Sequence, residues 1–173
     1  MRWTSTWLDD KLARMNDDTR VIRLTNGGFT LVDAEQFDEL NKVRWNLAPS
    51  GHVRRSGANK TGVYMHRLIM QAPKGVEIDH RNRNARDNRK CNLRFCTRSQ
   101  NMANTLRTAP RKGSRFRGVI RHECGNYKRW VAQIKVNYKY HRLGYFKDEV
   151  EAARAYDAAA KLHFGEFARI NGV

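Results

Sequence analysis

The stretch that decides the fold runs from residue 75 to residue 101 and reads GVEIDHRNRNARDNRKCNLRFCTRSQN. It opens with a short apolar segment, residues 76–78, that we predict to be a brief strand leading into Asp79 and His80. Residues 81–92 are rich in Arg, Asn and Asp, a composition typical of an irregular loop. The pattern therefore places a charged dipeptide where a strand gives way to a loop.

A helix is predicted at the far end of this stretch. Thr97 and Gln100 have the spacing of a capping box, in which the side chain of each residue bonds to the backbone N–H of the other. We expect the helix to begin at Ser99 and to carry Asn101 in its first turn.

Four residues of the stretch fit the hydrolysis of a phosphodiester: Asp79, His80, Asn92 and Asn101. A neutral imidazole can serve as a base near pH 7, and Asp and Asn oxygens are hard ligands that suit Mg²⁺. Asn92 follows His80 by 12 residues, and Asn101 follows it by 21. A single asparagine at a useful distance means little in a basic loop, so the interpretation depends on the ordered set.

That ordered set resembles the HNH nucleases of the phage homing-endonuclease kind. The resemblance covers roughly residues 40–105, and residues 65–70 match a strand segment common in that group. The motifs that carry it are Gly75-Val-Glu-Ile-Asp-His80, Asp87-Asn-Arg, Asn92-Leu-Arg and Thr97-Arg-Ser-Gln-Asn101.

The resemblance implies a ββα-metal (His-Me finger) core, in which two strands and a helix surround one divalent ion. His80 would be the general base that activates water, and Asn92 would hold the loop so that the His80 ring is oriented. Asp79 and Asn101 would hold the ion, Mg²⁺ in the first place and Mn²⁺ as the alternative. Neither a zinc site nor a small-molecule cofactor is expected.

Three further residues leave alternatives open. His66 could line the site, but a hydrogen-bonded core histidine is the favoured interpretation. Cys91 and Cys96 flank the Asn92 segment without further partners at metal-binding spacing, so structural thiols are favoured over ligands.

The N-terminal part alternates strand and helix signals. An Asn-Gly-Gly sequence at residues 26–28 separates two apolar runs, which predicts a β-hairpin. We expect residues 1–40 to form a small layer over the nuclease core. The predicted elements are strands at 21–24 and 29–32, a helix at 34–43 with Phe37, Leu40 and Val43 on one face, and strands at 52–55 and 63–69 around a Gly/Asn/Lys turn.

The last 60 residues predict a three-stranded antiparallel sheet packed on one helix. The strands are expected at residues 116–122, 128–136 and 139–146, with Asn126 and Asn137 in the turns. Asp148 and Glu151 offer a capping box for a helix over residues 149–163. The apolar stripe of that helix is Val150, Ala153, Tyr156 and Ala160, and Gly165 is its expected stop.

Strict alternation gives this sheet two different faces. Trp130, Ala132, Ile134 and Val136 would lie on one face, with His141 and Leu143 toward the helix. The opposite face would be basic and rich in donors that suit the major groove of DNA. The residues predicted to contact DNA are Arg117, Arg121, Arg129, Gln133, Lys135, Tyr140 and Arg142.

This region, residues 114–171, resembles the plant ethylene-response-factor domain, also called the Apetala-two domain. The motifs are Phe116-Arg-Gly-Val119, Trp130-Val-Ala-Gln-Ile134, Leu143-Gly-Tyr-Phe146 and residues 152–160. That family binds DNA through its sheet. Arg117 keeps the residue type usual at a family contact, whereas Gln133, Lys135 and Arg142 are changed in type, so the plant target sequence is not transferred.

Charge supports a polyanionic partner. The formal net charge is +17 over 173 residues, and residues 53–173 hold 27 Lys and Arg against nine Asp and Glu. No run of about 20 apolar residues predicts a transmembrane helix, and no signal peptide is expected at the N-terminus. Much of the positive charge lies in loop-like, Asn-rich sequence rather than on an amphipathic helix, which favours nucleic acid over a membrane. The predicted sheet domain then favours double-stranded DNA as the partner.

The fold class predicted for the whole chain is α+β. It divides into an N-terminal region with the HNH nuclease (residues 1–102), a basic linker (103–113) and the Apetala-two-like domain (114–173). The predicted function is a homing or mobile endonuclease that nicks DNA as a monomer or cuts as a DNA-induced dimer, phage-encoded and active in the cytoplasm of a bacterial host. The alternatives are a DNA-binding regulator with an inactive HNH core and an RNA-directed or structure-specific nuclease.

Overall fold

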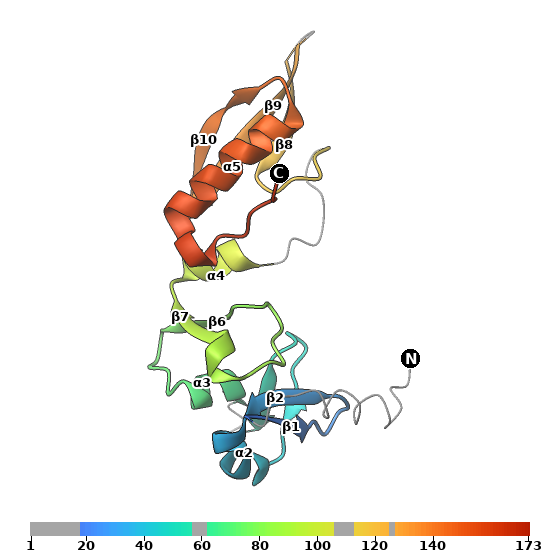
Figure 1. The fold of residues 1–173 in the computed structure, drawn as a ribbon, viewed down its shortest axis with the longest axis vertical. Coiled ribbons are helices and arrows are strands. Elements are labelled where there is room, and N and C mark those ends of the chain that lie inside the picture. The colour runs from blue at the N-terminus through green and yellow to red at the C-terminus, as the bar shows by residue number, and fades with distance from the viewer. Residues whose placement is uncertain (1–17, 57–61, 106–112, 125–126) are drawn as a thin grey trace. The chain divides into compact units, whose positions relative to one another are not determined.

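The computed structural model describes residues 18–56, 62–105, 113–124 and 127–173, and it divides between Phe95 and Cys96 into two compact units. Figure 1 traces the elements of both units. Mixed helices and small sheets make up each of them, as the α+β prediction requires. Among the described residues, no helix is long and apolar enough to cross a bilayer.

The described residues of the first unit form three small sheets and two short α-helices. In chain order its elements are β1 Thr19–Arg23, β2 Phe29–Asp33, α2 Ala34–Asn41, β3 Asn46–Leu47, β4 Val53–Ser56, β5 Gly62–Tyr64, α3 Met65–Ile69, β6 Glu77–His80, the 3-10 helix η2 Lys90–Asn92 and β7 Leu93–Cys96. The strands pair as β1–β2, β3–β4–β5 and β6–β7.

One apolar core unites this unit. Ile22 and Val32 of the β1–β2 hairpin and Leu40 of α2 are buried together with Ile78 of β6. Trp45 is 1 % exposed, and its indole N–H donates to the carbonyl of Leu40 at 2.7 Å. The described part of the predicted N-terminal layer therefore shares its core with the strand that carries Asp79 and His80.

Several local predictions are confirmed in this unit. The Asn-Gly-Gly hairpin forms with Thr19 opposite Asp33, and α2 buries Leu40, with Phe37 and Val43 packed against the core. The strand predicted at residues 76–78 forms one residue later and extends through His80. The predicted Gly/Asn/Lys turn lies outside the described residues.

The strand predicted at residues 63–69 is wrong over most of its length. Only Gly62–Tyr64 is extended, and Met65–Ile69 is a helix, α3. Met65, His66 and Ile69 are all buried, which fits one face of a helix, whereas a strand would turn Met65 and His66 to opposite faces. Burial of Met65 and Ile69 in the shared core favours the helix.

The second unit is a helix-covered sheet preceded by a short helix. Its elements are α4 Arg98–Asn104, β8 Val119–Cys124, β9 Tyr127–Val136, β10 Lys139–Phe146, α5 Glu149–Phe164 and the 3-10 helix η3 Gly165–Phe167. The strand order is β10–β9–β8, antiparallel throughout. Figure 1 shows α5 lying along this sheet.

Helix α5 packs on one face of the sheet through small residues. Ala152 and Ala153 are fully buried against Val119 and Ala132, and Tyr156 is buried against Ile134. The Asp148 side chain caps the helix by accepting from the backbone N–H groups of Val150 and Glu151, and Gly165 follows the last helical residue with φ of 51°. The helix predicted from the sequence is therefore confirmed and is one residue longer.

Strand β8 begins three residues later than predicted. The segment before it is a turn in which the Phe116 backbone N–H donates to Ser114 Oγ at 3.0 Å. Gly118 has φ of +73°, and a Cβ there would lie 1.9 Å from the Tyr156 ring. Only glycine permits this approach. Its positive φ interrupts the extended backbone, so the strand starts at Val119.

The β9–β10 turn is the two-residue type that the twist of a hairpin favours. Asn137 and Tyr138 both have positive φ, 47° and 67°, which is the type I′ pattern. The prediction for Asn137 is thus confirmed, whereas Asn126 lies outside the described residues.

Candidate functional site

Asp79 and His80 occupy the end of β6, and both are buried, each with 5 % of its surface exposed. The Asp79 carboxylate is paired with Arg94 of β7, whose Nε and Nη2 both donate to Asp79 Oδ2, at 2.9 and 2.7 Å. Arg94 is itself buried, so this is an ion pair inside the fold. The pairing offsets the charge that Asp79 brings into the core.

His80 is held from the loop by Asn88. The Nε2 of His80 lies 3.4 Å from Asn88 Oδ1, and Asn88 is completely buried. Burial lowers the pKa of His80, and the hydrogen bond to Asn88 opposes that effect. A lowered pKa keeps the ring neutral at pH 7, which is the form that can accept a proton.

The surrounding bonds determine how the Asn88 amide is oriented. Asn88 Nδ2 donates to Thr30 Oγ1 at 2.8 Å and faces the Ala85 carbonyl at 3.4 Å. The Thr30 hydroxyl donates in turn to the Arg86 carbonyl at 2.7 Å. A carbonyl only accepts, so the amide nitrogen must face Ala85 and the amide oxygen must face His80.

The ring tautomer of His80 follows from this orientation. Because Asn88 presents an acceptor, the bond at 3.4 Å requires a proton on His80 Nε2. The lone pair of the neutral ring then lies on Nδ1, which is the nitrogen able to take a proton from water.

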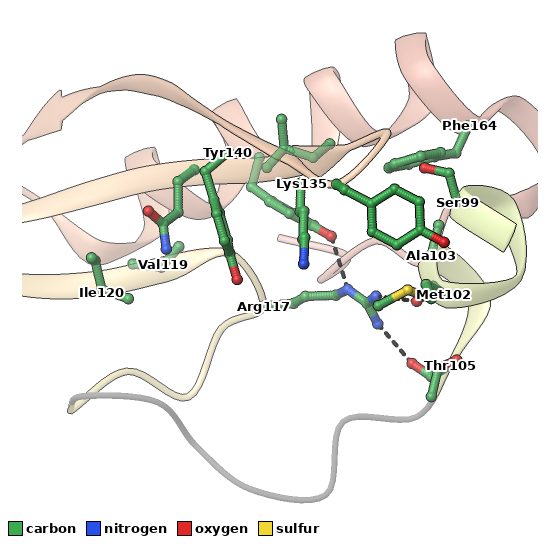
Figure 2. A pocket seen from close by; sticks show the side chains of 15 residues that line it. Ser99, Met102, Ala103, Thr105, Arg117, Val119, Ile120, Lys135, Tyr140 and Phe164 are labelled. Atoms are coloured by element: carbon green, nitrogen blue, oxygen red, sulfur yellow. Dashed lines mark hydrogen bonds between the residues drawn. The ribbon is translucent and has the colours of Figure 1, made fainter.

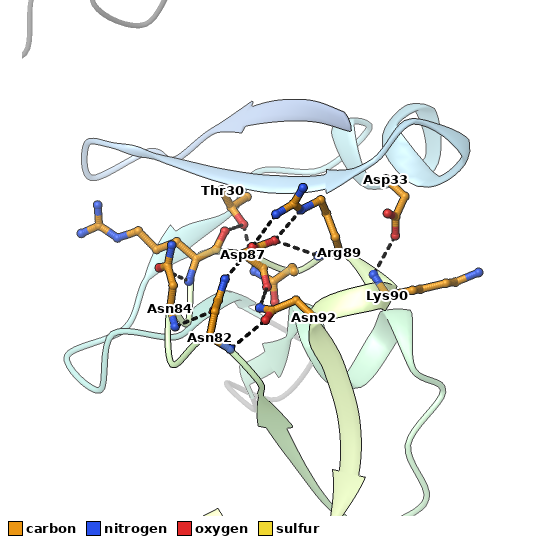
Figure 3. A network of polar contacts seen from close by, with 10 residues as sticks. Thr30, Asp33, Asn82, Asn84, Asp87, Arg89, Lys90 and Asn92 are labelled. Carbon is orange, nitrogen blue, oxygen red and sulfur yellow. Dashed lines mark hydrogen bonds and ion pairs between the residues drawn. The ribbon is translucent and has the colours of Figure 1, made fainter. Parts of the chain in front are cut away.

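Asn92 spans the base of the same loop (Figure 3). Its Oδ1 accepts from the Asn82 backbone N–H at 2.9 Å, and its Nδ2 donates to the Asp87 carbonyl at 2.7 Å. It therefore ties together two points of the loop between β6 and η2. Asn92 is 6 % exposed, so the ties are protected from water.

Asp87 is the central acceptor of the loop network in Figure 3. Arg89 donates to both of its carboxylate oxygens, at 2.8 and 2.7 Å, and Asn82 Nδ2 donates to Oδ2 at 2.8 Å. Burial alone would raise the pKa of Asp87, but the bonds from Arg89 and Asn82 hold it below its ordinary value. The carboxylate stays ionised and keeps the loop rigid.

A cluster of three histidine rings surrounds the end of β6. The His66 ring lies 5.3 Å from that of His80 and 5.2 Å from that of His52, between ring centres. His66 is 8 % exposed, and its Nδ1 has no hydrogen-bond partner within the described ranges. Burial lowers its pKa to about 3, assisted by His80 and His52. The favoured interpretation of His66 as a hydrogen-bonded core residue is therefore wrong at Nδ1, and its ring lies beside His80.

Asn101 lies on α4 in the second unit. The predicted capping box is present: Thr97 Oγ1 accepts from the Gln100 backbone N–H at 3.2 Å, and Gln100 Oε1 accepts from the Thr97 N–H at 2.8 Å. The helix begins at Arg98, one residue before the predicted start. Ala103 and Asn104, the first residues of the predicted linker, complete α4, and residues 106–112 lie outside the described ranges.

Known proteins are similar to two parts of this chain. The family model described as HNH endonuclease matches residues 63–103, the segment that contains Asp79, His80, Asn88 and Asn92. Residues 63–103 are therefore similar to this family.

A relative in Acanthamoeba polyphaga mimivirus, named as an uncharacterised HNH endonuclease, is 28 % identical over 151 residues, which is 85 % of this chain and 76 % of the relative. An APETALA2-like protein 2 of Oryza sativa subsp. indica is 52 % identical over 50 residues, 29 % of this chain. The same figures hold for its counterpart in subsp. japonica. This match spans only 11 % of each rice protein, so the chain is similar to a small part of those proteins.

The outward face of the Apetala-two-like sheet gathers most of the predicted DNA contacts. Gln133 lies opposite Arg142, and Lys135 lies opposite Tyr140, on adjoining strands. Arg142 and Lys135 are exposed, and Lys135 Nζ lies 5.3 Å from the centre of the Tyr140 ring. Arg129, also exposed, lies opposite His122 on the same face.

Arg121 and Arg117 do not join that face. Arg121 lies opposite Trp130 and so shares the helix-side face, because cross-strand partners point the same way. Its predicted place among the outward residues is wrong. Arg117 lies before β8, and its guanidinium bonds to Tyr156 and to carbonyls of α4 (Figure 2).

Sequence reasoning missed three residues that act on the site. Asn88 and Arg94 lie within the motifs Asp87-Asn-Arg and Asn92-Leu-Arg, but the pattern assigns neither of them a partner. Thr30 carries no local signal, because it bonds across 58 residues of chain to Asn88. A buried Asp or His next to a loop indicates that it has hydrogen-bond or ion-pair partners, but the sequence does not show which residues they are.

Proposed function

We propose that this chain is a metal-dependent DNA endonuclease of the homing or mobile type. The observation that carries the proposal is the arrangement at His80: a buried, neutral imidazole beside Asp79, within the segment that matches the HNH endonuclease family. His80 is the general base. The Asn88 contact supports Nδ1 as the nitrogen that takes the proton from the attacking water.

The donor set suits a hard cation. Asp79 and Asn101 offer a carboxylate and an amide oxygen, and Mg²⁺ accepts few protein ligands because it keeps several waters and takes phosphate oxygens directly. Within the described ranges, no group of three His, Cys, Asp or Glu side chains could hold a metal ion.

A bound Mg²⁺ or Mn²⁺ would stabilise the negative charge that develops on the phosphate. The chain's own residues do the rest. Asn92 and Asp87 hold the loop rigid, and Asn88 fixes the His80 ring by the bond at Nε2. Arg94 orients Asp79 through two bonds to Oδ2. These side chains form a ββα-metal core in our proposal.

The second unit recognises double-stranded DNA. The proposed contacts are Arg129, Gln133, Lys135, Tyr140 and Arg142 on the outward face. Support comes from the exposed basic face and from the likeness to the rice APETALA2-like proteins. One metal site per chain implies one nick per monomer, and a double-strand break then requires a DNA-induced dimer.

The likeness to a viral protein favours a mobile genetic element, and our proposal places its action in a bacterial host. The rival is a DNA-binding regulator with an inactive HNH core. It is favoured only by the similarity to the plant proteins, which is confined to residues of the second unit.

The test is incubation of supercoiled plasmid with the full chain and Mg²⁺ or Mn²⁺, beside His80→Ala. We expect nicked circles with the natural chain and a loss of roughly a hundredfold or more in rate with His80→Ala. His52→Ala is the matched control, because it removes a neighbouring ring that we assign no proton transfer. Absence of nicking with every divalent ion would leave the regulator. Equal nicking by His80→Ala would remove His80 as the base.

A further inference from the structure

Helix α4 is too short to be stable alone. It has seven residues, and isolated helices below about 12 residues are marginal in water. Its first turn is closed by the capping box of Thr97 and Gln100. Its last turn ends in Thr105 without a glycine cap, so the final carbonyls need other donors.

Arg117 supplies those donors (Figure 2). Its Nη2 donates to the Met102 carbonyl at 2.9 Å, and its Nη1 donates to the Thr105 carbonyl at 2.7 Å. Its Nε donates to Tyr156 Oη on α5 at 2.8 Å. All three guanidinium nitrogens are thus engaged, and the positive charge lies at the carboxyl end of α4, where the helix dipole favours it.

The backbone of Arg117 is itself fixed. Its N–H donates to Asn171 Oδ1 at 2.7 Å, and its carbonyl accepts from Asn171 Nδ2 at 3.2 Å. Asn171 is bound in turn to the buried Asp157 of α5 through two bonds to Oδ1. Gly118, the next residue, packs against the Tyr156 ring with no room for a Cβ. Arg117 therefore projects from a rigid part of the sheet domain.

Other contacts hold α4 to the same unit. Ser99 Oγ accepts from the Asn137 backbone N–H in the β9–β10 turn at 3.2 Å. Ala103 is buried in one cluster with Ile134 and Phe164. Arg169 reaches the Thr105 carbonyl only at 3.5 Å, which is a weak bond. Thr105 Oγ1 also donates to the Asn101 carbonyl, at 3.1 Å, so the bonds from Arg117, at 2.7 and 2.9 Å, are the shortest of these at the carboxyl end of the helix.

We propose that Arg117 is a positioning residue that fixes α4, and Asn101 with it, to the sheet that reads DNA, so that the cut falls at a set distance from the bound sequence. The inference rests on the proposed function, which assigns Asn101 to the metal. It differs from the basic linker predicted at residues 103–113, because Ala103 and Asn104 complete the helix that carries Asn101, and Ala103 is buried against the sheet domain.

The first experiment measures docking without DNA or metal. Amide hydrogen exchange at residues 102–105 is compared in the natural chain, Arg117→Met, Arg117→Lys and Tyr156→Phe. We expect exchange at least about tenfold faster in both Arg117 variants, because charge-assisted bonds are lost, and a smaller increase in Tyr156→Phe. Arg154→Met, which alters an exposed arginine on α5, is the matched control and should leave exchange unchanged.

The second experiment maps nicks on a supercoiled plasmid of known sequence with Mg²⁺. We expect a few dominant positions with the natural chain and with Arg154→Met, and a dispersed set with both Arg117 variants. A lysine retains a charge for phosphate but cannot bridge three acceptors, so it should not rescue the pattern.

Three results would overturn the inference: unchanged exchange in Arg117→Met, full rescue by Arg117→Lys, or faster exchange with unchanged nick positions. Exchange at α5 amides identifies global unfolding, and Tyr156→Phe then decides, since it removes one acceptor and keeps the ring. If the natural chain nicks no plasmid, the proposed function fails, and with it the role assigned to Arg117 in setting the cut.

Discussion

Arg94→Met tests whether Asp79 depends on a buried counter-charge. The two side chains are 7 % and 6 % exposed, and both bonds converge on one carboxylate oxygen. Methionine preserves most of the volume but leaves Asp79 inside the fold without its guanidinium partner. Breaking one side of such a pair costs about 3–5 kcal/mol, which is a large share of the stability of a small domain.

Arg67→Met is the matched control in the same unit. Arg67 also makes several bonds, but its partners are the carbonyls of Val76, Ala72 and Pro73, at 2.6–3.2 Å. Losing it leaves no buried charge, and water can reach the carbonyls. We expect a loss of about 1–2 kcal/mol, so the difference between the two variants isolates the cost of the uncompensated Asp79.

The assay is urea unfolding followed through the indole N–H resonance of Trp45, which reports the core of the first unit. Asp79→Asn combined with Arg94→Met should recover most of the loss, leaving about 1–2 kcal/mol. Mg²⁺ should stabilise Arg94→Met more than the natural chain if Asp79 holds the ion, because the cation replaces the lost charge. A loss below about 1 kcal/mol for Arg94→Met, or no recovery in the double variant, would refute the reasoning.

Three further predictions follow from the same structure. Thr30→Val should broaden or shift the ring ¹⁵N resonances of His80 and lower kcat more than it changes KM, whereas Thr19→Val, a similarly buried threonine of the hairpin, should do neither; identical spectra would exclude the relay through the amide. Tyr138→Gly should raise the free energy of unfolding of the second unit by about 1 kcal/mol, because a non-glycine residue at φ of 67° is strained; calorimetry that finds a loss would contradict this. Because the pKa of His66 is lowered to about 3 from 6.5, the unfolded chain binds an extra proton between these values, and stability should fall by about 2–3 kcal/mol from pH 7 to pH 4.5. His66→Gln should flatten that slope in thermal unfolding, and an unchanged slope would assign it to other groups.

The elements set by local chemistry were predictable. The Asn-Gly-Gly hairpin, the Thr97 cap, the Asp148 cap and the Gly165 stop each depend on one or two backbone positions and the side chains beside them. The placement of Ala132 and Ile134 on the helix side of β9 was also predictable, because alternation puts them on one face, and each is buried in a cluster with residues of α5.

Elements set by distant partners were not predictable in the same way. Met65–Ile69 has the composition of a strand and becomes a helix because Met65 and Ile69 enter one core with Val32 and Trp45. Arg121 was assigned to the outward face, but the start of β8 is fixed by the turn before Val119, and that start decides which residues face α5. A shift of one residue in a strand exchanges its two faces.

Part of the support for the proposed base, His80, lies outside the segment that matches the HNH endonuclease family. The matched segment, residues 63–103, contains His80 and Asn88 but not Thr30, which lies on β2. Without the Thr30 hydroxyl, Asn88 Nδ2 retains only the Ala85 carbonyl at 3.4 Å, a bond at the edge of useful geometry. The hairpin also bonds to the loop through its backbone. The Leu31 N–H donates to the Arg86 carbonyl, and the Leu31 carbonyl accepts from the Asn88 N–H, both at 2.8 Å. The N-terminal layer therefore belongs to the working site in our proposal, and a fragment limited to the matched residues should retain the motif while losing control of the His80 ring.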